Sequence, residues 1–109
     1  MAIATTIQDV YKVELMKGSH DHTTTTGHDF KLALFDAGAN IAATTLNFAA
    51  LSLETTNDSG SAYTTGGFTL VTEASMPTST AVAAYTDYGN ASWTTATFAA
   101  DGCLLYNAD

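Results

Sequence analysis

The stretch that decides the fold is FKLALF, residues 30–35. In an extended chain Leu32 and Leu34 project to one face, and Ala33 and Phe35 project to the other. Apolar side chains on both faces of a short run are typical of a central strand that is covered on both sides. We therefore expect a doubly covered strand here, with Leu32 and Leu34 both buried.

Residues 103–106 are the only later segment of comparable apolar density, and we expect them to pair with the first strand. Turns that contain Gly, Asn or Pro separate the other expected strands, at residues 68–71, 81–88 and 93–100. Short strands at this spacing are typical of a sandwich or barrel. The sequence therefore predicts an all-β fold, a small β-sandwich of the Ig-like or jelly-roll-like kind, in one domain over residues 1–109.

One helix is expected near the N-terminus, over residues 6–17. Apolar residues recur there at the spacing of one helical face: Ile7, Val10, Tyr11 and Leu15. Thr6 is the expected N-cap, with Asp9 in the position of the capping-box acid. Gly18 suits the left-handed residue that commonly ends a helix.

The expected core draws on all of these segments and consists of Phe30, Leu32, Leu34, Tyr63, Phe68, Leu70, Trp93, Leu104 and Tyr106. Tyr63 lies in the loop 57–67, whose glycines predict a bulged turn with the ring laid over the core. Trp93 is expected to pack in the core or at its edge. Cys103, within an apolar strand, is expected to be a small buried hydrophobe. Residues 41–53 fit neither the helical nor the strand period.

The charge balance excludes whole classes of partner. The 109 residues include 11 acidic and 3 basic ones, for a formal net charge of −8. Nucleic-acid binding neutralises phosphates with Lys and Arg, so we expect no direct nucleic-acid partner. The same reasoning disfavours anionic membranes. No apolar run reaches the roughly 18 residues of a membrane span, and the first residues lack the pattern of a signal peptide.

Potential metal ligands cluster in one loop, as His20, Asp21, His22, His28 and Asp29. A His-x-His pair can place two imidazoles on one metal ion, and a third histidine could complete the site. The spacing matches no specific metal signature, so we expect no metal and no cofactor, and a solvated polar loop instead. His20 follows the helix end, where its ring is expected to cap backbone carbonyls.

No catalytic site is predicted. The sequence has no Gly-x-Ser-x-Gly elbow and no recognisable nucleophile beside a base. Gly66 and Gly67 lack the following Lys of a phosphate-binding loop, which favours a β-bulge. The single cysteine excludes an intrachain disulfide and a Cys-based zinc cage. An enzyme or metal-binding domain that uses the histidine loop stays as the alternative from a different class.

Several fragments match patterns of one family in order along the chain. Residues 11–20, YKVELMKGSH, match the helix pattern Phe/Tyr-Lys-x-Glu-Leu-x-x-Gly-x-His, and residues 30–35 match Phe-Lys-x-Ala-Leu-Phe/Tyr. Residues 60–70 match Gly-x-x-Tyr-Thr-x-Gly-Gly-x-x-Leu. Residues 93–97 and 102–106 match Trp-x-x-Ala-Thr and Gly-x-Leu-x-Tyr. In these fragments the chain resembles the small virion structural proteins of tailed bacteriophages.

The resemblance implies a non-enzymatic protein of the virion, assembled in the bacterial host cytoplasm, with no catalytic residues to transfer. The implied role is a capsid decoration or cement protein on the outer head surface, with the major capsid protein as a partner. A neck, tail or fibre protein that contributes to adsorption is the alternative. The family often has Arg where this chain has Asp101, so an outer contact there is expected to differ in sign. The family also runs on beyond the position of Asn107, so either the chain continues beyond Asp109 or a neighbour completes the sheet.

The residues themselves also predict self-association. The Ala-rich segments 81–84 and 96–100 bury little volume, and nothing after residues 103–106 is available to cover that apolar strand. An unpaired apolar edge invites strand addition. We expect an interface there, either a trimer on the outer capsid surface or another homo-oligomer.

Overall fold

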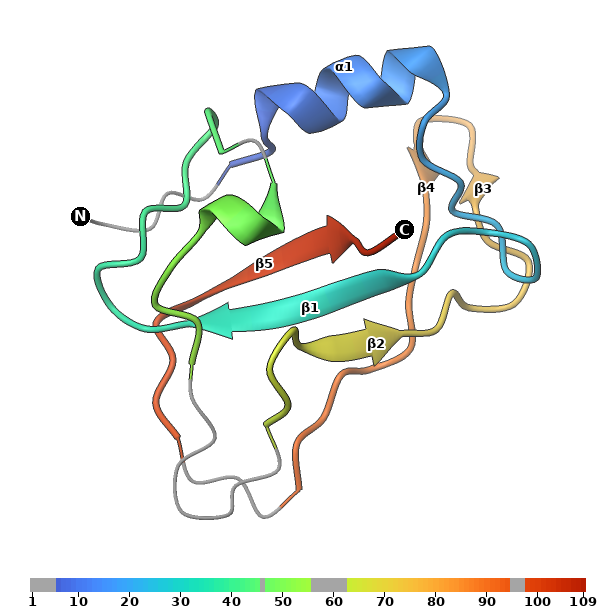
Figure 1. Ribbon diagram of the computed structural model, residues 1–109. Coiled ribbons are helices and arrows are strands. Elements are labelled where there is room, and N and C mark those ends of the chain that lie inside the picture. Colours follow the sequence, from blue (N-terminus) through green and yellow to red (C-terminus); the bar gives the residue numbers. More distant parts are fainter. Residues whose placement is uncertain (1–5, 46, 56–62, 95–97) are drawn as a thin grey trace.

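A three-stranded antiparallel sheet with the strand order β2-β1-β5 lies at the centre of the fold (Figure 1). The computed structural model describes residues 6–45, 47–55, 63–94 and 98–109. Along the chain the elements are α1 (Asp9–Lys17), β1 (Phe30–Phe35), the 3₁₀ helix η1 (Phe48–Ala50), β2 (Phe68–Leu70), β3 (Thr78–Ser79), β4 (Ala84–Tyr85) and β5 (Gly102–Asn107). The fold is therefore β-rich with one short α-helix.

The central position of β1 confirms its expected role. It pairs with β5 along its whole length, from Phe30 opposite Asn107 to Phe35 opposite Gly102. On its other edge β2 pairs with the first half of β1. A bridge between Phe35 and Glu54 continues that edge, and Thr55 N donates to the Leu34 carbonyl over 2.9 Å. The expected pairing of β1 with the last apolar segment is confirmed.

One face of the sheet is closed, and we call it the covered face. Ala33, Phe35 and Leu104 project from it and are buried. Its cover comes from the chain that follows β1. Ala39 and Ile41 are buried against this face, and Phe48 and Leu51, from the segment that fits neither period, pack on it. Tyr106 completes the layer, and its ring stacks on Phe48 with centroids 4.4 Å apart.

The opposite face is only half closed, and we call it the open face. Its apolar residues, which the pairing register places on one side of the sheet, are Phe30, Leu32, Leu34, Phe68, Leu70, Cys103 and Leu105. Leu32 and Leu34 are half-buried rather than buried, Leu105 is 48% exposed and Cys103 is exposed. The expected double coverage is wrong, because neighbouring rings cover this face mainly at its ends. His22 stacks on Phe30 at one end, and Trp93 meets Phe68 edge-on at the other.

Only some of the residues predicted for the core are buried. Phe30, Tyr63 and Leu104 are buried. Six others are only half-buried: Leu32, Leu34, Phe68, Leu70, Trp93 and Tyr106. The prediction missed four residues of the covered side, Ala33, Phe35, Ala39 and Ile41. Most of the half-buried residues belong to the open face, where no second layer of described strands lies over them.

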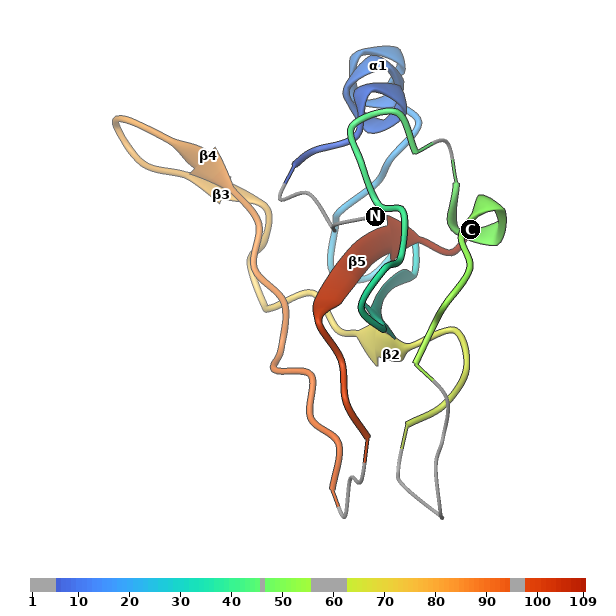
Figure 2. The same cartoon turned by 90° about the vertical axis from the view of Figure 1, so that its left-hand side faces the viewer.

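A short hairpin replaces the strand expected over residues 81–88. Its strands β3 and β4 pair through the turn 80–83, in which Thr80 N donates to the Ala83 carbonyl over 2.7 Å. The hairpin projects from the body of the molecule (Figure 2), and Val82 near its tip is 94% exposed. The strand expected over 93–100 is also absent from residues 93–94 and 98–100, and residues 95–97 lie outside the described part of the chain.

The helix begins later than expected and ends where expected. Its N-cap is Gln8 without a side-chain hydrogen bond, so the expected cap by Thr6 is wrong. Asp9 N is bonded instead to the carbonyl of Ala43, over 2.8 Å. At the other end Gly18 takes a left-handed φ of 72°, as predicted.

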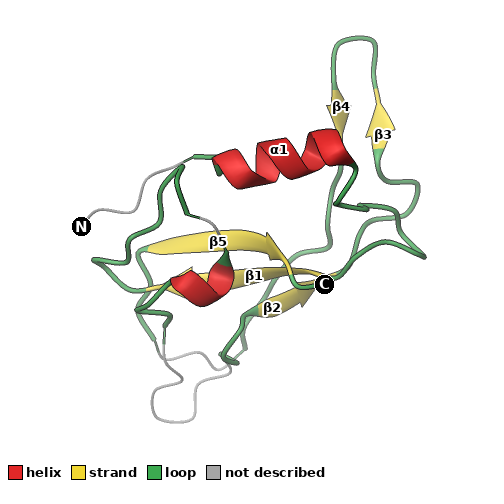
Figure 3. Cartoon of the chain, turned by 45° about the horizontal axis from the view of Figure 1, so that its top comes forward, coloured by secondary structure: helices red, strands yellow, loops and turns green. Residues whose placement is uncertain are grey.

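Helix α1 buries none of its residues. Ile7 and Leu15 of the expected apolar stripe are 59% and 46% exposed, and Met16 is 82% exposed. The helix lies on the β5 side of the sheet, opposite β2, in all three views (Figures 1–3). Neither helix of the described residues is long and apolar enough to cross a membrane. An apolar stripe therefore does not hold α1 in place, and polar contacts must do so.

Candidate functional site: a histidine clasp

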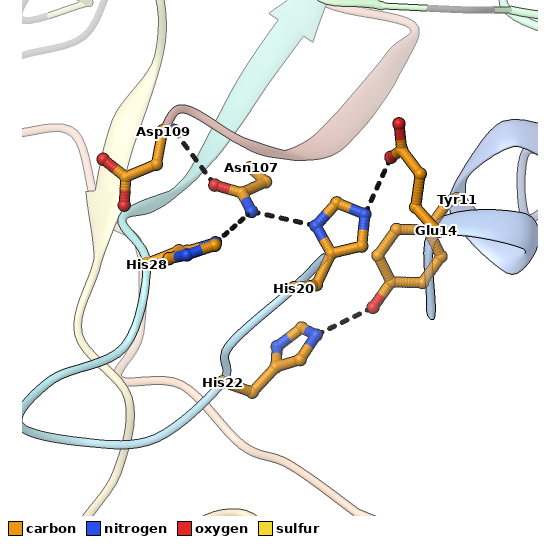
Figure 4. Close-up of polar contacts among 7 residues, drawn as sticks. All are labelled: Tyr11, Glu14, His20, His22, His28, Asn107 and Asp109. Atoms are coloured by element: carbon orange, nitrogen blue, oxygen red, sulfur yellow. Dashed lines mark hydrogen bonds and ion pairs between the residues drawn. The ribbon is translucent and has the colours of Figure 1, made fainter. Parts of the chain in front are cut away.

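The three histidines of the loop between α1 and β1 gather at the end of β5 (Figure 4). They contact side chains from both ends of the chain. We call the set the histidine clasp, and it consists of Tyr11, Glu14, His20, His22, His28, Tyr88 and Asn107. The histidines were singled out from the sequence, whereas Tyr88 and Asn107 were not assigned to this loop.

Asn107 is the centre of the clasp. Its Nδ2 group donates to Nδ1 of His20 over 2.9 Å and to Nδ1 of His28 over 2.7 Å. Its Oδ1 accepts the Asp109 N–H over 3.0 Å. Because the amide donates to both rings, both Nδ1 atoms must carry a lone pair, and the ring protons lie on Nε2. His20 then donates from Nε2 to Glu14 Oε2 over 2.9 Å, which ties α1 to β5 through one ring.

His22 lies between two tyrosines. Its Nε2 contacts the Tyr11 hydroxyl at 2.9 Å and its Nδ1 contacts the Tyr88 hydroxyl at 2.6 Å. Its ring stacks on Phe30 with centroids 4.3 Å apart. Burial, and then the neighbouring His20, lowers the pKa of His22. Burial also raises the pKa of Tyr11, and raises that of Tyr88 to about 12. The ring is therefore neutral at pH 7 and donates to one hydroxyl while it accepts from the other.

Local hydrogen bonds shape the loop that carries the rings. The Asp21 carbonyl accepts His28 N–H over 2.8 Å, and its carboxylate accepts Thr23 N–H over 2.9 Å, which lowers the pKa of Asp21. A side chain at Gly27 would overlap the Thr23 carbonyl. Asp29 joins the loop to the C-terminal end, since its carbonyl accepts Ala108 N–H over 2.7 Å.

The clasp has the chemistry of a structural joint. Both ring nitrogens of His20 and His22 are already engaged with side chains of the same chain. Among the residues that the structure describes, no group of three His, Cys, Asp or Glu side chains is placed to hold a metal ion. The expected capping of backbone carbonyls by His20 is wrong, because its ring bonds to Glu14 and Asn107 instead.

A second polar centre closes the turn at Gly66. Glu54 Oε1 accepts the Tyr63 hydroxyl over 2.7 Å and the Gly66 N–H over 2.6 Å. The Tyr63 hydroxyl accepts Leu34 N–H over 3.0 Å. Burial, and then the bond to Glu54, raises the pKa of Tyr63 far above its usual value. This turn therefore binds a carboxylate of its own chain, which argues against a phosphate cradle.

The Tyr63 ring carries out its predicted covering role. It packs on Trp93 and Phe98, with centroids 5.9 and 5.5 Å apart. Trp93 in turn meets Phe68 edge-on at 5.7 Å. Trp93 therefore packs at the edge of the open face, one of its two expected positions. Glu54 was missed, because a single acid in an irregular segment gives no sequence signal.

Exposed apolar residues gather on β5 and on the hairpin. Cys103 was expected to be buried and is exposed, because it projects from the open face. Leu105 beside it is 48% exposed, and β5 is an edge strand of the described sheet. The hairpin segment 74–86 contains no charged residue. Both features are typical of contact surfaces.

Comparison with models of protein families, with curated proteins and with solved structures finds no match for this chain.

Proposed function

We propose that this chain is a non-enzymatic structural component of a bacteriophage virion, in the first place a capsid decoration or cement protein on the outer head surface. Its partners would be the major capsid protein and further copies of itself, as a trimer or another homo-oligomer. The resemblance of its fragments to small virion proteins of tailed phages motivates the class of function. The exposed apolar side of β5 is the observation that carries the proposal.

Strand β5 has the properties of a contact strand. Cys103 and Leu105 are exposed on its open side, while Leu104 between them is buried in the core. No charged residue lies between Asp101 and Asp109. Fully covering a Leu side chain contributes about 1.5–3 kcal/mol, so a partner on this strand recovers part of that for Leu105 in each copy. Many such modest contacts add up on a shell that presents repeated sites.

The charge suits the outer surface of a particle. A net charge of −8 repels packaged DNA and offers few cations for phosphate contacts. We therefore propose no direct nucleic-acid contact and no membrane contact, and place the protein in the virion after assembly in the host cytoplasm.

The open face also bears on whether the fold is a sandwich. The described sheet has one covered face and one open face that lacks a second layer of described strands. We propose that a partner layer over Leu32, Leu34 and Leu105 completes a small sandwich of the Ig-like or jelly-roll-like kind. Sheets that stack in this way lie about 10 Å apart.

The projecting hairpin favours one alternative, a neck, tail or fibre protein. Val82 and Tyr85 are 94% and 45% exposed on an uncharged arm that stands off the body. Such an arm suits insertion into a neighbouring subunit of a tail or fibre. The number of copies per particle decides between the two roles, since a shell protein is present in many more copies than a tail protein.

Binding to isolated phage capsids tests the proposal. The wild-type chain is expected to saturate capsids of its own phage at a copy number in the range of the major capsid protein. Leu105→Lys should abolish binding, because it places a charge on the contact strand. Val82→Lys is the matched control, an exposed aliphatic residue away from β5, and it should bind as the wild type does. Equal binding by both variants would contradict the assignment of β5, and retained binding only at tails would favour the alternative.

A further inference from the structure

We propose that helix α1 is a detachable guard over the outer edge of β5, that the histidine clasp holds it closed, and that its release opens this edge to β5 of a second copy. The inference rests on the proposed function, because it describes how the same contact strand is regulated. It makes association dependent on a conformational step within each chain.

The hydrogen-bond pattern of the sheet shows which backbone groups of β5 point away from β1. The bond from Ala108 N to the Asp29 carbonyl continues the ladder between β1 and β5. Bonds in an antiparallel ladder alternate, so Leu104 and Tyr106 exchange bonds with β1. The backbone groups of Cys103 and Leu105 therefore point away from β1. The helix lies on this side of β5 in every view (Figures 1–3), and covering an edge with a helix is a common protection against strand addition.

The guard is weakly held. A helix of nine residues without a buried face is marginal by itself. Three tertiary hydrogen bonds anchor it in the described structure: Asp9 N to the Ala43 carbonyl, Tyr11 to His22, and Glu14 to His20. The last two belong to the clasp. Loss of the two clasp bonds therefore leaves α1 with one tertiary hydrogen bond, from Asp9 N to the Ala43 carbonyl, and with the packing of the Tyr11 ring on His20 at 4.7 Å between centroids.

The clasp also connects the guard to the strand that it covers. Asn107 belongs to β5, and its amide holds the ring of His20, which in turn binds Glu14 of the guard. Movement at the end of β5 and release of the helix are therefore parts of one network. A strand that pairs with β5 and shifts Asn107 would weaken the same bonds that keep the guard closed.

A second copy of β5 is the occupant that the charge pattern favours. Two chains that each carry a net charge of −8 repel, and they can approach most closely through segments free of acids. Residues 102–107 and the hairpin segment 74–86 are such segments, and the edge that the guard covers belongs to residues 102–107. An antiparallel pair with Leu104 opposite its own copy places Cys103 opposite Leu105 of the second chain, so that both exposed apolar residues gain cover. This pairing is two-fold and gives a dimer rather than a trimer.

Two helix variants separate the guard from simple surface effects. Tyr11→Phe with Glu14→Ala removes both clasp bonds and keeps the helix-forming tendency of the segment. Lys12→Ala with Met16→Ala is the matched control, since both residues are exposed on the same helix. Hydrogen exchange of the α1 amides reports release, and sedimentation reports dimerisation. We expect exchange to be about tenfold faster in the clasp variant. The dimer dissociation constant should be about a hundredfold lower, because the edge must open in both copies, and neither quantity should change in the control.

The outcomes distinguish the two proposals. Faster exchange with unchanged dimerisation, or unchanged exchange in the clasp variant, overturns the guard and leaves a shell role standing. Absence of dimers in every variant also overturns the guard, and absence of capsid binding overturns the proposed function. Tyr11→Phe alone is expected to give a smaller effect in the same direction. If the double variant does not fold, this single variant provides the test. Leu105→Cys should form disulfide-linked dimers through Cys103, faster in the clasp variant, if the two-fold register holds.

Discussion

The two faces of the central sheet are similar in apolar content and differ in what covers them. Phe35 on the covered face is fully buried, whereas Leu105 on the open face is 48% exposed. The difference comes from the connections, because the segment that carries Ala39, Ile41 and η1 folds back over one face only. Apolar alternation along a strand therefore indicates two potential interfaces, and the irregular segments decide which one belongs to the core.

Truncation of the covered face should produce the largest effect. Phe35→Ala removes a fully buried ring, and we expect a loss of about 3–5 kcal/mol in the free energy of unfolding. Urea unfolding of the two proteins measures the difference. Leu105→Ala is the control from the other face and should cost far less. Equal costs would show that both faces are covered in solution.

Loss of the polar centre at Gly66 should have an intermediate effect. Glu54→Leu leaves the Tyr63 hydroxyl and the Gly66 N–H without their acceptor, and we expect a loss of about 1–3 kcal/mol. Glu54→Gln keeps an acceptor oxygen at the same length and should be milder. If the two variants unfold at the same urea concentration, the hydrogen bonds are not the source of the stability.

Acidification should weaken the end of the open face that His22 covers. Its folded pKa is lowered, so the unfolded chain binds the proton first and stability is lost as the pH falls from about 7.5 through the ordinary value near 6.5. Tyr11, Tyr88, His20, Asp21 and His28 are the titratable neighbours.

Unfolding of wild type and His22→Gln at several pH values checks this expectation. The variant should lose less stability between about pH 7.5 and pH 5. The lowered pKa of Asp21, with an ordinary value of 3.8, acts below this window. An identical pH dependence of the two proteins would contradict the role of His22.

A charge on the open face should have the smallest effect on the monomer. Leu105→Lys keeps its long apolar stem against the sheet and its ammonium in water, so we expect the free energy of unfolding to change by no more than about 0.5 kcal/mol. Thermal unfolding measures this change. A loss of several kcal/mol would place Leu105 in the core.

The sequence predicted those features of the fold that depend on local or strongly periodic patterns. The pairing of β1 with β5, the end of α1 at Gly18 and the cover by Tyr63 were all predictable from apolar density and glycine positions. The choice of the covered face was not predictable, because Ala39 lies in the connection after β1 and Ile41 lies in a segment without a period. The clasp could not be predicted either, since Asn107 contacts His20 across 87 positions of sequence. A polar contact over that distance leaves no periodic trace.

The hairpin of β3 and β4 has a practical consequence for protein engineering. Its tip between Val82 and Ala83 is exposed and lies away from both the core and the clasp. Exposed loop tips of this kind accept inserted peptides well, and each doubling of loop length costs only about 0.6 kcal/mol in closure entropy. An epitope or affinity tag placed there would be displayed on the arm while the central sheet keeps its packing.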